Sequence, residues 1–181
     1  MNGAALKVEL ERHHPASYGW ARSCCIRNPA DAEDVLQIVY LKILEGKAHF
    51  RGESSFKTWL FAVIRNTALT ERRRQLLRLR FSEVAPPSFR PGPELALETS
   101  ERQARFQAAL RQLPRRQREV LHLVFYEDFS LQEASAVMGI SLGSARTHYE
   151  RGKKRLRALL SAPERKHGIE WRRQSNPDAV S

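Results

Sequence analysis

The residues best suited to chemistry in this sequence are cations and hydroxyl-bearing side chains that recur at helical spacing over positions 144–155. Arginine can read guanine edges in the major groove, serine and threonine bond to bases or phosphates, and lysine holds phosphate. The polar face consists of Ser144, Arg146, Thr147, His148, Arg151, Lys154 and Arg155. The opposite stripe consists of Ala145, Tyr149, Gly152 and Leu156, which we expect to face a core. The spacing predicts a DNA-reading helix, with a solvated basic face as the alternative.

The sequence also predicts the elements that must position this helix. Ser130 followed by Glu133 forms a capping box, which satisfies the free amides of a new helix. Gly139 suits the left-handed residue that ends a helix, and Ser141 can cap the next one. A supporting helix is expected after Pro114. Helix, short glycine-containing turn and helix together predict a helix-turn-helix motif.

A second group of chemically distinctive residues is FRGESSFKTWLFAVIRN, from Phe50 to Asn66. Arg51 and Gly52 suggest a loop, and Ser54 or Ser55 a helix cap. Aromatic residues beside cations suit single-stranded DNA, because bases stack while phosphates meet charge. Alternatively, most of the aromatics serve the core and the arginine run that follows is a solvated helix end.

A third pattern, DAEDVLQIVYLKIL over residues 31–44, predicts a helix with acids at its N-terminus, where the helix dipole favours them. The apolar stripe of this helix consists of Leu36, Val39, Tyr40 and Ile43. A different face carries Asp34, Gln37, Ile38 and Leu41. Two apolar residues among polar ones indicate either a docking surface for another protein or a second core stripe.

Composition sets the frame for these motifs. The 181 residues include 31 Lys and Arg against 20 Asp and Glu, a net charge of +11, which favours a polyanionic partner such as nucleic acid. With 41% hydrophobic residues a packed core is expected. Apolar residues recur every three or four positions without sustained alternation, so the predicted class is all-α. No apolar run approaches a membrane span or a signal peptide, which predicts a cytoplasmic protein without membrane contact.

Proline divides the chain into parts. Residues 81–100 include Pro86, Pro87, Pro91 and Pro93 and are predicted to form an extended linker. The linker separates one small helical domain, residues 1–80, from another, residues 101–162. Such a tether would let the two domains touch well-separated sites on one duplex. The remaining residues, 163–181, form a polar tail.

Enzymatic motifs are missing from the sequence. It has no Asp, Glu and His cluster at metal-binding spacing, no phosphate-binding glycine loop, and no nucleophile beside a plausible base. Cys24 and Cys25 are adjacent and lack the spaced partners of a zinc site. We therefore predict no catalytic residue, metal or cofactor.

Four motifs in order, DAEDVLQ, FRGESSFKTWLFAVIRN, LPRRQREVL and the helix-turn-helix, resemble the extracytoplasmic-function (ECF) group of sigma-70 factors over residues 14–160. The resemblance implies that residues 1–80 are sigma region 2, which docks on core RNA polymerase and opens the −10 element. It also implies that residues 101–162 are sigma region 4, which binds the −35 element. Partners implied are the β′ clamp helices and β flap of polymerase, promoter DNA and an anti-sigma factor.

The resemblance also assigns residues to these contacts. Polymerase docking falls to Asp34, Gln37, Ile38 and Leu41. Contacts with the −10 element fall to Phe50, Arg51, Ser54, Ser55, Lys57, Trp59, Arg65, Asn66, Arg72 and Arg73. Contacts with the −35 element fall to Ser144, Arg146, Thr147, His148, Arg151, Lys154 and Arg155.

One departure from the family concerns docking. Ile38 stands where relatives usually carry an acid, which predicts a weaker or differently arranged polymerase contact. A phosphorylated threonine such as Thr58 is one hypothesis for restoring the charge. The main alternative function is a regulator that binds an operator through the helix-turn-helix alone, without polymerase.

Overall fold

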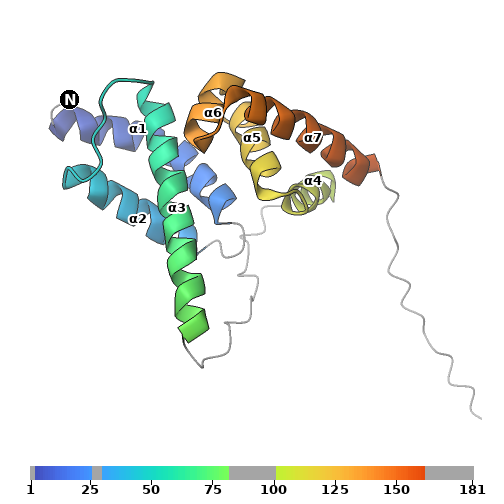
Figure 1. Cartoon of the computed structure of the whole chain (residues 1–181). Helices are drawn as coiled ribbons and strands as arrows, with labels where there is room; N and C mark the ends of the chain where they lie inside the picture. Colours follow the sequence, from blue (N-terminus) through green and yellow to red (C-terminus); the bar gives the residue numbers. More distant parts are fainter. Residues whose placement is uncertain (1–2, 26–29, 82–100, 162–181) are drawn as a thin grey trace, which may run out of the picture.

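The computed structural model describes residues 3–25, 30–81 and 101–161, and within these ranges it contains helices and loops but no strand (Figure 1). The helices are α1 (Gly3–Cys24), α2 (Asp31–Leu44), α3 (Phe56–Phe81), α4 (Glu101–Arg111), α5 (Arg115–Phe125), α6 (Leu131–Met138) and α7 (Leu142–Ser161). The predicted all-α class is confirmed. No helix in this part of the chain is long and apolar enough to span a membrane.

Helices α1, α2 and α3 pack on one another and form the N-terminal half. Trp20 of α1 is fully buried and stacks on Phe61 of α3, with 5.8 Å between ring centroids. The Trp20 indole N–H donates to the Phe61 carbonyl oxygen at 3.0 Å, so this large ring is fixed in orientation as well as buried. Of the predicted stripe of α2, Leu36, Val39 and Ile43 are buried and Tyr40 is half-buried, and the helix also buries Ala32 and Val35.

The helix-turn-helix is formed by α6 and α7. The Ser130 hydroxyl oxygen accepts from the Glu133 backbone N–H at 3.2 Å, and the Glu133 carboxylate accepts from the Ser130 N–H at 2.9 Å. Gly139 follows in the left-handed region, at φ 60°. The Ser141 hydroxyl oxygen then accepts from the Ser144 N–H at 3.2 Å. The predicted caps and turn are therefore all present.

Helices α5 and α7 approach closely at Gly152. A Cβ atom at this position would lie 3.1 Å from Leu121 Cδ1 and 3.3 Å from the Gln117 carbonyl oxygen. A side chain at this position would force Leu121 or Gln117 of α5 to shift by a few tenths of an ångström. Ala145 and Leu156 of the same stripe are buried and Tyr149 is half-buried, so the predicted core-facing side of α7 is confirmed.

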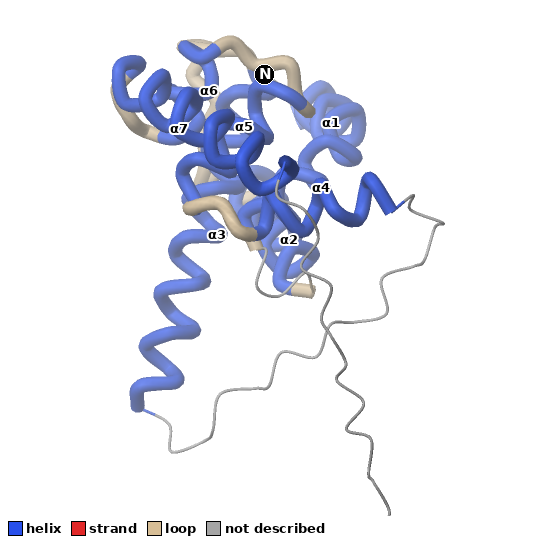
Figure 2. The backbone as a smooth tube through the Cα atoms, turned by 90° about the vertical axis from the view of Figure 1, so that its right-hand side faces the viewer, coloured by secondary structure: helices blue, strands red, loops and turns tan. Residues whose placement is uncertain are grey.

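The two halves also pack on each other, α6 against α3 and α5 against α1. Figures 1 and 2 show α5 and α6 beside the N-terminal part of α3, whereas the C-terminal part of α3 projects away. Val120 and Leu123 of α5 belong to the same buried cluster as Trp20 and Phe61. The two predicted domains are thus halves that share a core here. Their boundaries remain predictions, because residues 82–100 and 162–181 lie outside the described part of the chain.

Candidate protein and nucleic-acid interfaces

The predicted docking residues of α2 lie on its outer side. Asp34, Gln37 and Leu41 are exposed, Leu41 by 57%, and Ile38 is half-buried. Sequence reasoning missed Leu44, which is 60% exposed and lies three residues after Leu41 on the same side of the helix. The three-residue spacing between Leu41 and Leu44, which places both on one side of a helix, was the sequence signal that could have identified Leu44. We call Asp34, Gln37, Ile38, Leu41 and Leu44 the α2 face.

The loop before α3 forms a small hollow of about 110 Å³ with Trp59. Its lining consists of His49, Phe50, Arg51, Glu53, Ser54 and Trp59. Phe50, Phe56 and Trp59 form an aromatic triad with ring centroids 5.3 to 5.4 Å apart. Gly52 turns the loop with φ +78°. His49 and Glu53 are additions to the predicted set, and the only sequence signal was that His49 precedes FRGESS and Glu53 lies within it.

Ser55 has a structural role in this arrangement. Its hydroxyl oxygen accepts from the Thr58 backbone N–H at 3.1 Å and bonds to the Thr58 hydroxyl at 2.8 Å. Of the two serines considered as a helix cap, Ser55 is therefore the one that caps α3. Thr58 is only 3% exposed, so its hydroxyl is closed to a kinase in this arrangement. The hypothesis of a phosphorylated Thr58 is not supported by this geometry.

Lys57 and Arg65, both assigned to DNA by the resemblance, are occupied by carboxylates of the C-terminal half. Lys57 Nζ lies 3.0 Å from Glu127 Oε2 and donates to the Glu127 carbonyl oxygen at 2.9 Å. Arg65 Nε donates to Glu119 Oε2 at 3.1 Å, and Arg65 is only 5% exposed. In this arrangement Arg65 is buried, and Lys57 is paired with a carboxylate while 27% of its side chain stays exposed.

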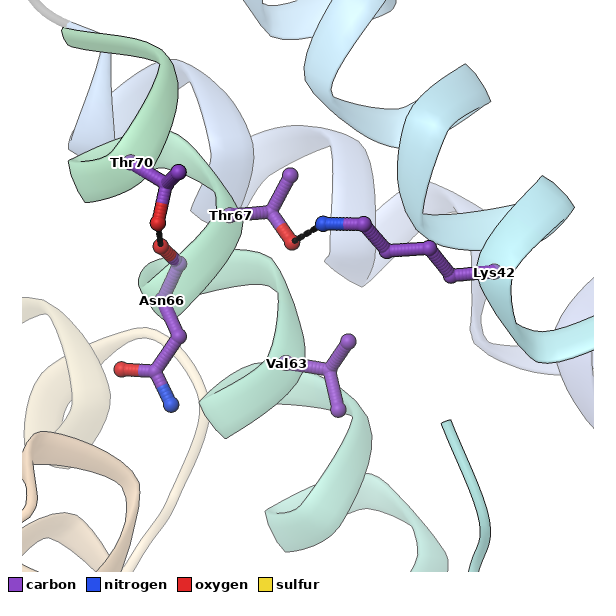
Figure 3. A pocket seen from close by; sticks show the side chains of 5 residues that line it. All are labelled: Lys42, Val63, Asn66, Thr67 and Thr70. Atoms are coloured by element: carbon purple, nitrogen blue, oxygen red, sulfur yellow. Dashed lines mark hydrogen bonds between the residues drawn. The ribbon is translucent and has the colours of Figure 1, made fainter. Parts of the chain in front are cut away.

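Three other α3 residues that the resemblance assigns to the −10 element are open to solvent. Asn66, Arg72 and Arg73 are exposed. Asn66 lines a shallow hollow of about 250 Å³ between α2 and α3, together with Lys42, Val63, Thr67 and Thr70 (Figure 3). Figure 3 shows Lys42 reaching from α2 to α3, where its Nζ donates to the Thr67 hydroxyl oxygen at 3.3 Å. This contact ties the docking helix to the helix that presents Asn66.

The polar side of α7 is accessible as predicted. Arg146, Thr147, Arg151, Lys154 and Arg155 are exposed, and Ser144 and His148 are half-buried. Burial first, and the nearby charges of Arg116 and Arg151 next, lower the pKa of His148. His148 is therefore a neutral hydrogen-bonding group at neutral pH rather than a cation. Arg116 of α5 is exposed beside this face and was missed, although it lies in the LPRRQREVL motif.

Both halves of the chain match models of known protein families. The family model for Sigma-70 region 2 matches residues 10–77, and that for Sigma-70, region 4 matches residues 103–156. The ECF RNA polymerase sigma factor EcfG of Rhodopseudomonas palustris is 33% identical over 136 residues, covering 74% of this chain and 73% of the relative. The RNA polymerase sigma factor CarQ of Myxococcus xanthus is 32% identical over 160 residues, covering 84% and 87%.

Two solved structures resemble the fold across both halves. Sigma factor RpoE in complex with the anti-sigma factor NepR, from Bartonella quintana, gives a TM-score of 0.69 at 27% identity and covers 88% of this chain and 99% of that one. CnrH in complex with the cytosolic domain of CnrY gives 0.63 at 26% identity, covering 90% and 92%.

Proposed function

The chain belongs to the ECF group of the sigma-70 family of RNA polymerase sigma factors, and from this premise we propose which of its surfaces meet polymerase and promoter. It is an alternative sigma factor that directs transcription initiation. The observation that supports this function best is the presence of both region models in one chain whose α2 face is exposed and partly apolar. An operator-binding regulator needs the helix-turn-helix but has no use for region 2.

The α2 face is proposed to dock on the β′ clamp helices of core polymerase. Leu41 and Leu44 expose apolar area that a partner can cover, and Asp34 adds a negative charge at its edge. Ile38 lies among them without a charge, so the contact at this position is apolar. The β flap is proposed as the partner of the C-terminal half.

The hollow between the loop and Trp59 is proposed to receive a base of the −10 element. Unstacking a base costs a few kcal/mol, which a pocket with aromatic walls and nearby cations can offset. Phe50, Arg51, Ser54 and Trp59 line this hollow. The exposed residues Asn66, Arg72 and Arg73 would follow the backbone of the strand.

Helix α7 is proposed to enter the major groove of the −35 element. Its exposed arginines suit guanine edges, whereas Lys154 and Thr147 suit phosphates. In this proposal the chain performs no chemistry of its own, acts in the cytoplasm with polymerase, and is controlled by an anti-sigma factor. One of the similar solved structures is a sigma factor in complex with the anti-sigma factor NepR.

Run-off transcription tests the proposal. Core polymerase is incubated with a promoter library, with and without the full chain, and the products are sequenced. We expect products that start at fixed distances from a shared pair of elements only when the chain is present. Tight, specific duplex binding by the chain alone, with no promoter-dependent product from active core, would favour the operator-binding regulator instead.

A further inference from the structure

Helix α7 carries a single acidic residue, and it lies within the cationic polar side of the helix. Glu150 is exposed, and the residues one helical turn before and after it are Arg146, Thr147, Lys153 and Lys154. Because phosphates repel a carboxylate, Glu150 weakens the attraction of α7 to a duplex of any sequence. The carboxylate can favour binding only through a contact with a base, since bases carry hydrogen-bond donors and phosphates do not.

The ion pair that Glu150 forms within α7 does not use the whole carboxylate. Lys153 Nζ lies 2.8 Å from Glu150 Oε1, but the Glu150 side chain stays 67% exposed, and exposed pairs at this spacing stabilise a helix only slightly. The Lys153 ammonium also lies 4.3 Å from the centre of the Tyr149 ring, which stacks on Phe125 of α5. Lys153 is thereby held in place and orients Glu150. One ammonium cannot fill all the acceptor sites of a carboxylate, so the others are open to a partner.

Thr147, one turn before Glu150, also presents an acceptor. Its hydroxyl donates to the Gly143 carbonyl oxygen at 3.0 Å, so the hydroxyl proton is engaged and the oxygen offers its lone pairs. Phosphate oxygens are acceptors too. With this bond in place Thr147 suits the donor of a base, which narrows its proposed contact from a phosphate to a base. Two acceptors therefore lie next to each other on the exposed side of α7.

The four bases differ in the donors that they show in the major groove. Cytosine presents its N4 amino group, and adenine presents its N6 amino group beside the acceptor N7. Guanine and thymine present acceptors on these edges. Neither Thr147 nor Glu150 offers a free donor for adenine N7, which would be left unpaired. Cytosine is therefore the base that this pair of acceptors suits best.

Resting on the proposed function of α7 at the −35 element, we propose that Glu150 is a specificity-determining residue that selects cytosine. Its carboxylate, with the Thr147 oxygen beside it, accepts from the N4 amino group of one cytosine in the major groove. The same carboxylate repels the acceptor atoms of guanine and thymine, which sharpens the selection. The preferred −35 element accordingly holds this cytosine in addition to the guanines that the arginines of α7 read.

A promoter library with a randomised −35 region tests this inference. Each promoter carries a barcode in its transcribed region, so sequencing of the run-off products shows which −35 sequences were used. Core polymerase transcribes the library with the full chain. The parent chain should favour cytosine at one position by about five-fold or more, as expected for one specific base contact.

Two variants of Glu150 separate base reading from other roles. Glu150→Gln keeps the size of the side chain but gives it a donor beside its acceptor, which suits adenine N7 and N6, so the preference at this position should shift from cytosine to adenine. Glu150→Ala should remove the preference at this position and leave the other positions unchanged. Glu11→Gln is the matched control, because Glu11 is an exposed acid of α1 outside the helix-turn-helix, and it should keep the parent preference. Circular dichroism checks that the variants fold.

Unchanged base preference in Glu150→Gln, in a chain that still directs transcription, overturns the inference and leaves the sigma function standing. The carboxylate would then serve only its pair with Lys153. Absence of any promoter-dependent product would instead remove the proposed function. Duplexes of the same library, selected by the full chain alone, then test Glu150 apart from polymerase. A shift from cytosine to adenine in Glu150→Gln supports the inference, and identical or random selections by both chains overturn it.

Discussion

Leu41 and Leu44 are exposed leucines on a helix whose other side is fully used by the core. Exposing such side chains forgoes roughly 1.5 to 3 kcal/mol each relative to burial, so a surface that holds two of them close together is typical of a contact site. Ile38 continues the apolar character of this surface towards α2's N-terminal turn. The α2 face is therefore suited to a partner that offers apolar side chains between charged ones.

Leu41→Ala should weaken binding to core polymerase by about 1 kcal/mol or more, since truncation removes apolar area at the centre of the contact. The free energy of unfolding should change by less than about 0.5 kcal/mol, because the residue is exposed. Fluorescence titration with core and thermal unfolding give the two values. Val8→Ala is the control, an equally exposed apolar residue on α1 at 61%. Equal loss of binding in both variants would contradict the assignment of the α2 face.

Arg151→Ala should reduce affinity for promoter duplex containing the −35 element by about 1 to 3 kcal/mol and relax sequence preference at one position. Its guanidinium is exposed on the predicted reading side of α7. Arg12→Ala is the control, because Arg12 is an exposed arginine on α1, outside the helix-turn-helix. Core binding should be unaffected in both. A loss of core binding in Arg151→Ala would show that the roles of the halves are wrongly assigned.

At the scale of elements, the helix-turn-helix depends on interactions between residues that are close together in the sequence. Helix α6 has only eight residues, too few to be stable alone, and is held by its capping box, the Gly139 turn and packing on its neighbours. Helix α7 is held against α5 by the close approach at Gly152. The orientation of the reading side of α7 follows from this spacing.

Gly152→Val should lower the free energy of unfolding by about 1 to 3 kcal/mol, since the added side chain enters a space already filled by Leu121 and Gln117. Gly143→Val is the control in the same helix, because the nearest atom to a Cβ at Gly143 is the Ser141 hydroxyl oxygen at 4.0 Å. Chemical denaturation of both variants measures the difference. Equal stability would mean that α5 and α7 are less closely packed than the structure indicates.

At the scale of the whole molecule, the relation between the halves decides which surfaces are available. The packing of the halves leaves most of the α2 face and of the polar side of α7 exposed, whereas Arg65 is buried and Lys57 is paired with Glu127.

Acidification should weaken the contact between the halves. Burial tends to raise the pKa of Glu127, but hydrogen bonds and charge from His122 and Lys57 outweigh it, and the net pKa is lowered. A carboxylate with a lowered folded-state pKa stabilises the fold above its ordinary pKa, and this contribution is lost as pH falls through the folded-state value. Below the ordinary value of 4.5, the stability advantage of the parent chain over Glu127→Gln should shrink. Thermal unfolding of both across pH 3 to 7 measures it, and a constant difference would contradict the role of Glu127.

The sequence by itself determined the features that depend on neighbours a few residues apart. The capping box of α6, the left-handed Gly139, the buried stripe of α2 and the exposed cations of α7 all follow from local hydrogen bonding and helical period. Their order along the chain also indicated the sigma family. These signals are readable because each acts within one or two helical turns.

Only the tertiary structure shows which groups Lys57 and Arg65 pair with. The type of a cation is the same whether it meets a phosphate or a carboxylate, so sequence reasoning assigned both to DNA. Their partners lie 70 and 54 residues further along the chain, and no local pattern links them. Charge pairing across such a separation depends on how helices pack. The ion pairs between the two halves therefore became visible only in the fold.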